Sequence, residues 1–149
     1  MLETLVTAAL LVLSGIWTGA ITTIAWERIP VWRRLDPVPR AVDFRRSLHR
    51  MDPTMPIIAV IVIGLGVTHA LGHEGLARTL AWIAVGGIAL VVVGSILLLE
   101  PINSRFRRLP EGAPPPDAAD LHVRWSWLHL GRTVVAVVSL TLFVLAALS

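Results

Sequence analysis

Long uncharged runs of apolar residues alternate with polar segments along the chain, and this pattern predicts its helices. A helix needs about 20 predominantly apolar residues to cross the hydrocarbon core of a membrane. Four stretches meet this requirement, and we predict spanning helices at about residues 4–26, 55–73, 79–99 and 122–148. The polar segments between them are predicted to be long loops at residues 27–54 and 100–121. The expected fold is an all-α bundle of four transmembrane helices, formed as one domain over residues 1–149.

The composition supports a membrane protein and narrows the chemistry open to it. Of the 149 residues, 55% are hydrophobic and 15% are charged, whereas soluble domains have about 45–50% apolar and about 25% charged residues. The chain has no cysteine, which excludes disulfides, thiolate metal sites and cysteine nucleophiles. A bound metal ion would therefore have only nitrogen and oxygen ligands.

The basic residues, 13 in all, are all arginines, and most lie in the two long polar segments. Because cytoplasmic loops are enriched in Lys and Arg, we expect these segments to face the cytoplasm and both termini to face outward, in a bacterial inner membrane. Tryptophans near the span ends predict an aromatic belt on that side: Trp26, Trp32, Trp125 and Trp127. The arginines follow the membrane boundary, so we expect membrane lipid as a partner and no nucleic acid.

The two halves of the chain repeat a short polar pattern of Glu, Pro, Arg-Arg-Leu and Leu-His. The first half carries Glu27, Pro30, Arg33-Arg34-Leu35 and Leu48-His49, and the second carries Glu100, Pro101, Arg107-Arg108-Leu109 and Leu128-His129. A true duplication predicts two parallel helix-loop-helix repeats, with a site at their junction. Chance similarity between short basic segments is the alternative.

If the halves correspond, four side chains converge at the cytoplasmic end of the bundle: Glu27, His49, Glu100 and His129. Carboxylates and imidazoles from facing helices are the ligands with which helix bundles bind iron or manganese, and imidazole also suits copper. These residues are therefore candidate ligands for iron or copper. The alternative is that the glutamates form interfacial ion pairs with nearby arginines.

The last helix carries a polar stripe of four residues at i, i+3, i+7 and i+10: His122, Trp125, His129 and Arg132. This spacing places all four along one face of the helix. Arg132 directly precedes a long uncharged run, and an ionisable side chain there is costly enough to be a functional candidate. We expect Glu100 to be its partner, with Asn103 beside them. The alternative is a purely structural salt bridge, or a side chain that reaches back to the interface.

Two further patterns make local predictions. Asp52 followed by Pro53 predicts the N-terminal cap of the second span. Gly15 and Gly19 form a G-x-x-x-G motif, in which small residues let helix backbones approach closely. This motif suits packing within the bundle or a homo-oligomer, and the sequence leaves both open.

The second half of the chain carries two short motifs at the ends of predicted helices. Pro101 and Asn103 form a P-x-N motif at the end of the third helix, and Arg124, Trp125, His129 and Arg132 form an R-W-x-x-x-H-x-x-R motif at the start of the fourth. In both motifs the chain resembles the anthrone-oxygenase-like family of small four-helix membrane proteins. The first helix ends less distinctively, so roles for Glu27 and His49 depend on the repeat alone.

The resemblance implies a membrane oxygenase that oxidises a lipophilic aromatic or polyketide-type small molecule. In a cofactor-free version, His129 is expected to act as general base, while Arg132 and Asn103 stabilise an enolate or peroxide anion. In a metal-dependent version, Glu27, His49, Glu100 and His129 would hold iron or copper. A different class of function also fits, namely a non-enzymatic membrane scaffold that recruits a partner through its arginine-rich segments.

Overall fold

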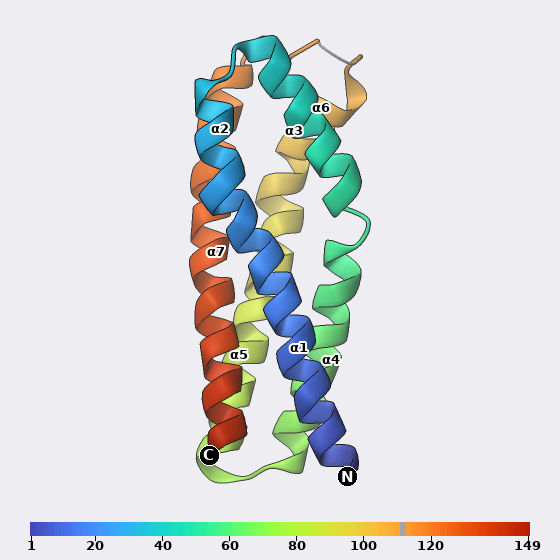
Figure 1. Ribbon diagram of the computed structural model, residues 1–149, viewed down its shortest axis with the longest axis vertical. Helices are drawn as coiled ribbons and strands as arrows, with labels where there is room; N and C mark the ends of the chain where they lie inside the picture. The colour runs from blue at the N-terminus through green and yellow to red at the C-terminus, as the bar shows by residue number, and fades with distance from the viewer. Residues whose placement is uncertain (111–112) are drawn as a thin grey trace.

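The computed structural model describes residues 1–110 and 113–149, and Figure 1 shows them as an elongated bundle of helices. No strand occurs among these described residues. The elements follow in the order α1 (Leu2–Thr23), η1 (Ile24–Arg28), α2 (Ile29–Arg34), α3 (Pro37–Met51), α4 (Met55–Gly72), α5 (Gly75–Gly94), η2 (Ser95–Leu99), α6 (Glu100–Arg108) and α7 (Ala118–Leu148). The segments η1 and η2 are π-helices.

Four helical stretches are long and apolar enough to cross a membrane: Leu2–Arg34, Met55–Gly72, Gly75–Arg108 and Ala118–Leu148. The predicted fold class is confirmed, and the chain is an integral membrane protein. The first and third stretches contain 33 and 34 residues, which at about 1.5 Å per residue gives a length of about 50 Å. Because the hydrocarbon core is about 30 Å thick, these helices extend well beyond it.

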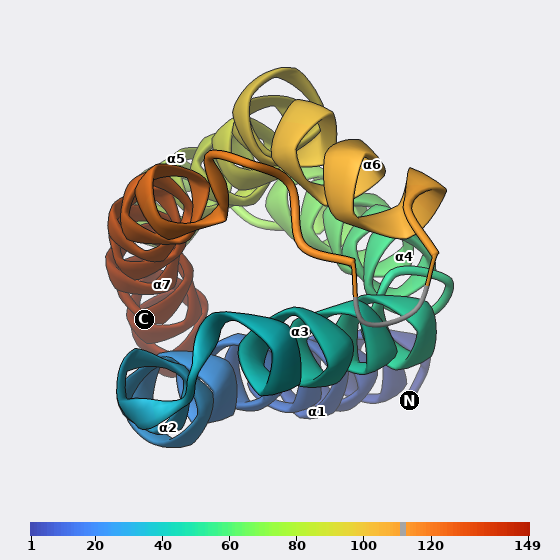
Figure 2. The same ribbon diagram turned by 90° about the horizontal axis from the view of Figure 1, so that it is seen from above.

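The extensions form a second layer at one end of the bundle, which we call the cap: α2, α3, α6 and the first turns of α7. Both termini and the α4–α5 connection lie at the opposite end (Figure 1). Seen from the cap, α1, α4, α5 and α7 surround a common axis, with α3 and α6 on opposite sides of it (Figure 2). The topology is therefore up and down, and α1 and α5 run in the same direction.

The two predicted loops are largely helical, which corrects the expectation for residues 27–54 and 100–121. Helices α2 and α3 fill most of the first segment, and α6 fills the start of the second. Helix α7 begins at Ala118 instead of about residue 122, while residues 111–112 lie outside the described part. These cap helices are short and amphipathic, so a criterion based on 20 apolar residues does not detect them.

The first and third of these stretches each contain a π-helix at an equivalent place, shortly before a proline. Pro30 follows η1 and Pro101 follows η2 at the same offset. Proline lacks an N–H and its ring collides with the carbonyl four residues earlier, and a wider π turn accommodates both effects. The two halves thus share a backbone irregularity as well as a sequence pattern.

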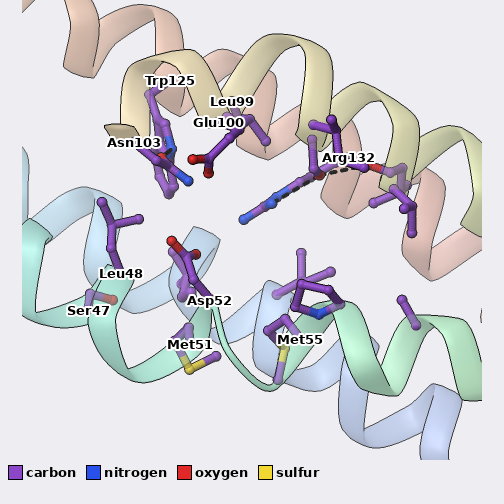
Figure 3. Close-up of a pocket in the computed structure, with 18 of the residues that line it drawn as sticks. Ser47, Leu48, Met51, Asp52, Met55, Leu99, Glu100, Asn103, Trp125 and Arg132 are labelled. Carbon is purple, nitrogen blue, oxygen red and sulfur yellow. Dashed lines mark hydrogen bonds between the residues drawn. The ribbon is translucent and has the colours of Figure 1, made fainter. Parts of the chain in front are cut away.

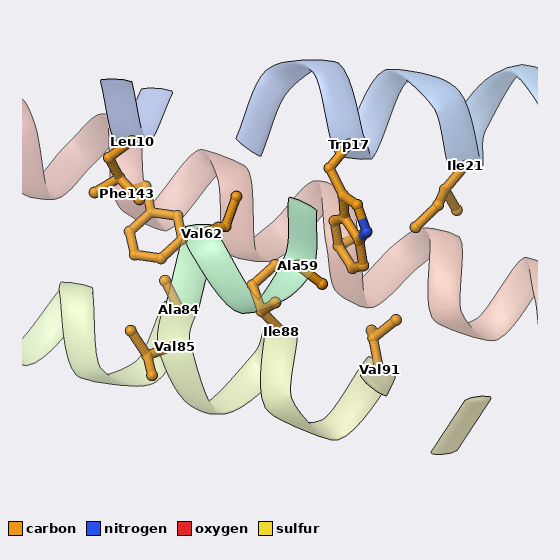
Figure 4. Close-up of a cluster of buried hydrophobic side chains, with 11 residues drawn as sticks. Leu10, Trp17, Ile21, Ala59, Val62, Ala84, Val85, Ile88, Val91 and Phe143 are labelled. Carbon is orange, nitrogen blue, oxygen red and sulfur yellow. The ribbon is translucent and has the colours of Figure 1, made fainter. Parts of the chain in front are cut away.

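The membrane layer has its own apolar core, which Figure 4 shows. Its buried residues come from all four spans: Leu10, Trp17, Ile21, Ala59, Val62, Ala84, Val85, Ile88, Val91, Ala136 and Phe143. Close backbone approach is required at Gly66, where an added Cβ would lie 2.7 Å from Val85 and 2.9 Å from Phe143. At Gly15 and Gly19 an added Cβ would meet nothing within 4 Å, so the G-x-x-x-G motif does not pack helices together within the chain.

The cap has a separate core, dominated by aromatic side chains. Phe44 is fully buried, and its ring centroid lies 4.6 Å from that of His122 and 5.0 Å from that of Trp125. Trp32 and Trp125 are 3% and 2% exposed, whereas Trp26 is 84% exposed. The predicted aromatic belt is therefore wrong for Trp32 and Trp125, which stabilise the cap instead of facing the membrane interface.

Candidate active site

A cavity of about 330 Å³ lies between the membrane core and the cap core. Its walls are mainly apolar, with a small set of polar side chains: Ser47, Asp52, Ser95, Glu100, Asn103 and Arg132. They come from α3, η2, α6 and α7 and from the α3–α4 connection, and Figure 3 shows Asp52, Glu100, Asn103 and Arg132 directed toward a common space. An apolar pocket with a few convergent polar groups is the usual form of a small-molecule site.

Pro56 of α4 and Ile96 of η2 both line the cavity and are exposed, and Met51 and Met55, which are partly exposed, line it too. From this exposure we infer that the cavity opens between α4 and η2, with these four residues as its rim. Ile96 is 61% exposed. The opening is thus apolar and lies along the side of the bundle, at the level where the helices pass from the membrane layer into the cap.

Arg132 projects from α7 into this cavity, with its guanidinium directed toward Asp52 and Glu100 (Figure 3). Its Nε and Nη2 atoms donate to His129 Nδ1 at 3.1 and 2.7 Å, and Nη1 donates to Ser95 Oγ at 3.3 Å. No carboxylate of the described residues forms an ion pair with it. The predicted Arg132–Glu100 pair is therefore absent, and the cation is held by neutral partners.

His129 lies behind Arg132 and is completely buried. Its Nε2 atom is 3.0 Å from the carbonyl oxygen of Ile21, and because a carbonyl only accepts, Nε2 carries the proton. The other ring nitrogen, Nδ1, then accepts from Arg132. The imidazole also stacks on Trp125, with centroids 4.7 Å apart and planes inclined by 20°. The stripe predicted on α7 does face the interior.

The two carboxylates in the cavity wall are joined by Arg107 of α6. Its guanidinium donates to Asp52 and to Glu100, and Ser104 also donates to Glu100 at 2.7 Å. Asp52 does not cap α4, whose N-cap is Thr54 and has no side-chain hydrogen bond. The predicted cap is wrong because the chain turns at 52–54, and this turn directs Asp52 into the cavity.

The environment of Asp52 shifts its acidity. Burial raises the pKa of this carboxyl above its ordinary value, and the negative charge of Glu100 acts in the same direction, while the nearby cations Arg107 and Arg132 lower it. Burial has the largest effect because removal from water disfavours the charged form. A carboxylate with a raised pKa is a stronger base than one in water, so Asp52 is suited to accept a proton.

Asn103 of α6 lines the cavity on the side of the cap. Its Oδ1 accepts a hydrogen bond of 2.9 Å from the indole N–H of Trp125, which fixes the amide and leaves its NH₂ group as a donor. The P-x-N and R-W-x-x-x-H-x-x-R motifs therefore meet in space, through Asn103 and Trp125 and then through His129 and Arg132.

The four candidate metal ligands do not come together. Glu27 pairs with Arg28 at 3.5 Å, with its side chain 53% exposed, His49 is exposed and contacts Arg45, and Glu100 contacts Arg107. Both ring nitrogens of His129 are already engaged. Among the described residues, no group of three or more His, Asp or Glu side chains is placed to hold a metal ion. The residues present do not fit the iron or copper site inferred from the repeat.

Sequence reasoning missed Asp52, Ser95 and Arg107 as parts of this site. Asp52 has the pattern of a helix cap, Ser95 resembles an ordinary small residue in an apolar span, and Arg107 belongs to a run that marks the membrane boundary. The repeat offered one signal. Ser95 and Ile24 stand at the same offset before Pro101 and Pro30, so the second half has a polar residue where the first has an apolar one.

Comparisons with known proteins give one match. A family model described as anthrone oxygenase matches residues 44–142. The matched range begins at Phe44 in the cap and includes the polar groups of the cavity, while Trp17, Ile21 and Trp32 lie outside it. No curated protein and no solved structure matches the chain.

Proposed function

The chain belongs to the anthrone oxygenase family, and from this premise we propose that it is a membrane oxygenase acting on a lipophilic aromatic substrate in the cavity between core and cap. The proposal concerns molecules of the anthrone type, in which a methylene carbon lies between two aromatic rings and opposite a ring carbonyl. Loss of a proton from that methylene gives a delocalised enolate, whose negative charge resides largely on the carbonyl oxygen.

The observation that carries this proposal is an arginine in an apolar cavity that forms no ion pair with any carboxylate of the described residues. Arg132 directs its guanidinium into the space that Asp52 borders. A charged group fixed in a site of low polarity stabilises a developing opposite charge far more than it would in water. The pair therefore suits the formation of an anion, with Asp52 taking the proton and Arg132 stabilising the enolate oxygen.

The proposed reaction converts the methylene and O₂ into a ring carbonyl and water. Asp52 removes one proton, and the resulting carbanion carbon forms a bond to oxygen, giving a peroxide. Loss of the second hydrogen from the same carbon, with cleavage of the O–O bond, forms the carbonyl and releases water. The substrate carbon loses four electrons to O₂, so no other oxidant is required. Asn103 donates from the side of the cap to the same anions.

His129, which the sequence suggested as base, is less well placed for that step than Asp52. It does not line the cavity, and neither of its ring nitrogens is free. Arg132 and Asn103 keep the anion-stabilising roles inferred from the sequence. The proposed assignment thus moves proton removal from a buried imidazole to a carboxylate in the cavity wall.

We further propose that the substrate enters from the bilayer through the opening between α4 and η2. The rim residues Met55, Pro56 and Ile96 are apolar, as a path for a membrane-dissolved molecule requires. The arginine-rich cap would face the cytoplasm of a bacterial cell and the termini would face outward, in agreement with the positive-inside rule.

The test is oxygenase activity of the purified protein in lipid nanodiscs with anthrone as the probe. We expect O₂ uptake and quinone formation to exceed the protein-free rate, and Arg132→Ala to lower kcat/KM about 10²–10³-fold. Arg124→Ala is the matched control, since Arg124 is exposed on the same helix. If the wild type neither binds anthraquinone, as judged by tryptophan fluorescence, nor oxidises anthrone, the proposal is overturned in favour of a non-enzymatic role.

A further inference from the structure

We propose that His129 is a positioning residue that orients the guanidinium of Arg132 and ties it to the first helix, and that it transfers no proton to or from the substrate. The proposal concerns the same site as the proposed function and rests on it for the kinetic measurements. Its binding measurements are independent of any turnover.

The first argument is that both ring nitrogens of the His129 imidazole already form hydrogen bonds. His129 is fully buried, its Nε2 proton is donated to the Ile21 carbonyl, and its Nδ1 lone pair receives two donors from Arg132. A general base needs a free lone pair within reach of the proton that it removes. The only lone pair of this imidazole points at a guanidinium, which does not give up its proton in proteins.

The second argument is the use of the guanidinium donors. An arginine has five N–H groups in a rigid fork. Two go to His129 and one goes to Ser95 Oγ, which leaves two donors on a guanidinium that is directed into the cavity (Figure 3). Trp125 supports the same arrangement, because its ring stacks on His129 and lies 5.8 Å from the Arg132 guanidinium carbon. The cation is thus held in one orientation.

The third argument is the origin of the two anchors. Ile21 lies in the last turn of α1, directly before η1, and Ser95 is the first residue of η2. In both halves the residue that begins the π-helix donates its N–H to the carbonyls three and four positions earlier. Both π-helices contact α7, and the last turn of α1 and the first residue of η2 each contribute one hydrogen-bond acceptor to the His129–Arg132 pair.

Three substitutions separate positioning from proton transfer. In His129→Asn the amide oxygen occupies the place of Nδ1, so it keeps the acceptor for Arg132 and loses the bond to Ile21. In His129→Gln the amide nitrogen reaches the place of Nε2, so it keeps the bond to Ile21 and loses the acceptor. His129→Ala loses both. His49→Asn provides the control, because His49 is an exposed histidine of the cap.

The binding experiment measures tryptophan quenching by anthraquinone-2-carboxylate and by neutral anthraquinone in nanodiscs. We expect the affinity of His129→Asn for the anion to stay within about tenfold of the wild-type affinity, because loss of one neutral hydrogen bond changes an equilibrium constant by about that factor. We expect His129→Gln and His129→Ala to lose about 10²-fold of anion affinity through misplacement of the cation, with neutral anthraquinone bound unchanged. Equal anion binding by all the variants would overturn the proposal.

The kinetic experiment measures kcat/KM for anthrone against pH. Positioning by His129 predicts that His129→Asn retains the acid limb of the wild-type profile and most of its activity. Catalysis by His129 predicts instead that Asn and Gln lose activity equally, about 10²–10⁴-fold, and that the limb disappears, which would refute positioning. A wild type that is inactive while the binding pattern holds would overturn the proposed function and leave the positioning role standing.

Discussion

Asp52 and Asp117 show how the surroundings of a single residue decide its chemistry. The Arg105 guanidinium donates two hydrogen bonds of 2.8 and 2.7 Å to Asp117 on the surface and holds the pKa of that carboxyl below its usual range. Burial beside the cavity raises the pKa of Asp52. Because basicity follows pKa, only Asp52 is adapted to take a proton from a weak carbon acid.

Replacement of Asp52 by asparagine removes the proposed base with little change in shape. We expect kcat/KM for anthrone to fall about 10²–10⁴-fold, the range attributed to general base catalysis, while anthraquinone still binds. Asp117→Asn, which alters an exposed carboxylate, serves as the control and should behave as the wild type does. Full activity in Asp52→Asn would exclude it as the base.

The positive charge of Arg107 lowers the pKa of Asp52, so replacement of Arg107 should shift the pH dependence of the reaction. The cations that face Asp52 are Arg107 and Arg132, and the other carboxylate is Glu100. A carboxylate base works when deprotonated, so activity falls as the pH drops through its pKa. Loss of the Arg107 charge raises that pKa, and Arg107→Met should therefore move the acid limb of kcat/KM to higher pH. The control is Arg108→Met, which alters an exposed arginine. If the acid limb of Arg107→Met lies at the same pH as that of the control, Asp52 is not the base.

At the scale of elements, the irregular backbone segments beside the cavity are the two π-helices and the turn at 52–54. Regular helices through the same positions would continue their hydrogen bonding without interruption, whereas η1 and η2 each precede a proline and contact α7. The turn between α3 and α4 directs Asp52 inward (Figure 3). Of these irregular segments, η2 contributes Ser95 to the cavity and the turn contributes Asp52, while η1 contributes only the apolar Ile24. The other polar groups of the cavity come from the regular helices α3, α6 and α7.

Below the cavity, Gly66 lets α4 pack closely against side chains of α5 and α7. In Gly66→Ala the new Cβ would lie within 3.0 Å of atoms of Val85 and Phe143, both of which are buried. Overpacking of this kind costs about 1–3 kcal/mol, and we expect a lower thermal unfolding midpoint in detergent. Gly64→Ala, two residues earlier on α4, meets nothing within 4 Å and should leave the midpoint unchanged or raise it. Equal midpoints for both variants would argue against the close approach.

At the scale of the whole molecule, the protein has two stacked layers with different solvents. The core of the membrane layer is mainly aliphatic, the core of the cap is richer in aromatic side chains, and the cavity lies where they meet. At this level the apolar membrane layer meets the ionisable side chains of Asp52, Glu100 and Arg132. Most of the arginines lie in the cap, on α2, α3 and α6.

The orientation of this two-layer molecule can be measured directly because the chain has no cysteine. Single cysteines can replace exposed Arg50, in the last turn of α3 on the cap side, and exposed Glu74, in the α4–α5 connection at the end of the bundle away from the cap. Under the positive-inside rule, a membrane-impermeant maleimide added to intact spheroplasts should label Glu74→Cys and spare Arg50→Cys. The reverse labelling would show that the cap faces outward.

The sequence by itself determined the number of spans, the all-α class and the inward face of α7, because these follow from the length and the period of apolar runs. It also indicated that the two motifs of the second half belong together, and Asn103, Trp125, His129 and Arg132 do meet. These are local properties, in which residues a few positions apart share one face of one helix.

Only the tertiary structure decided which groups share the cavity. His129 meets Ile21 across 108 positions of sequence and Arg132 meets Ser95 across 37, while the expected partners Glu27 and His49 remain at the surface. Asp52 changed from a helix cap to a candidate base because a three-residue turn rotated it inward. Helical periodicity fixes the face on which a side chain lies, but the packing of separate helices fixes what that face meets, and the partners of a buried charge depend on the latter.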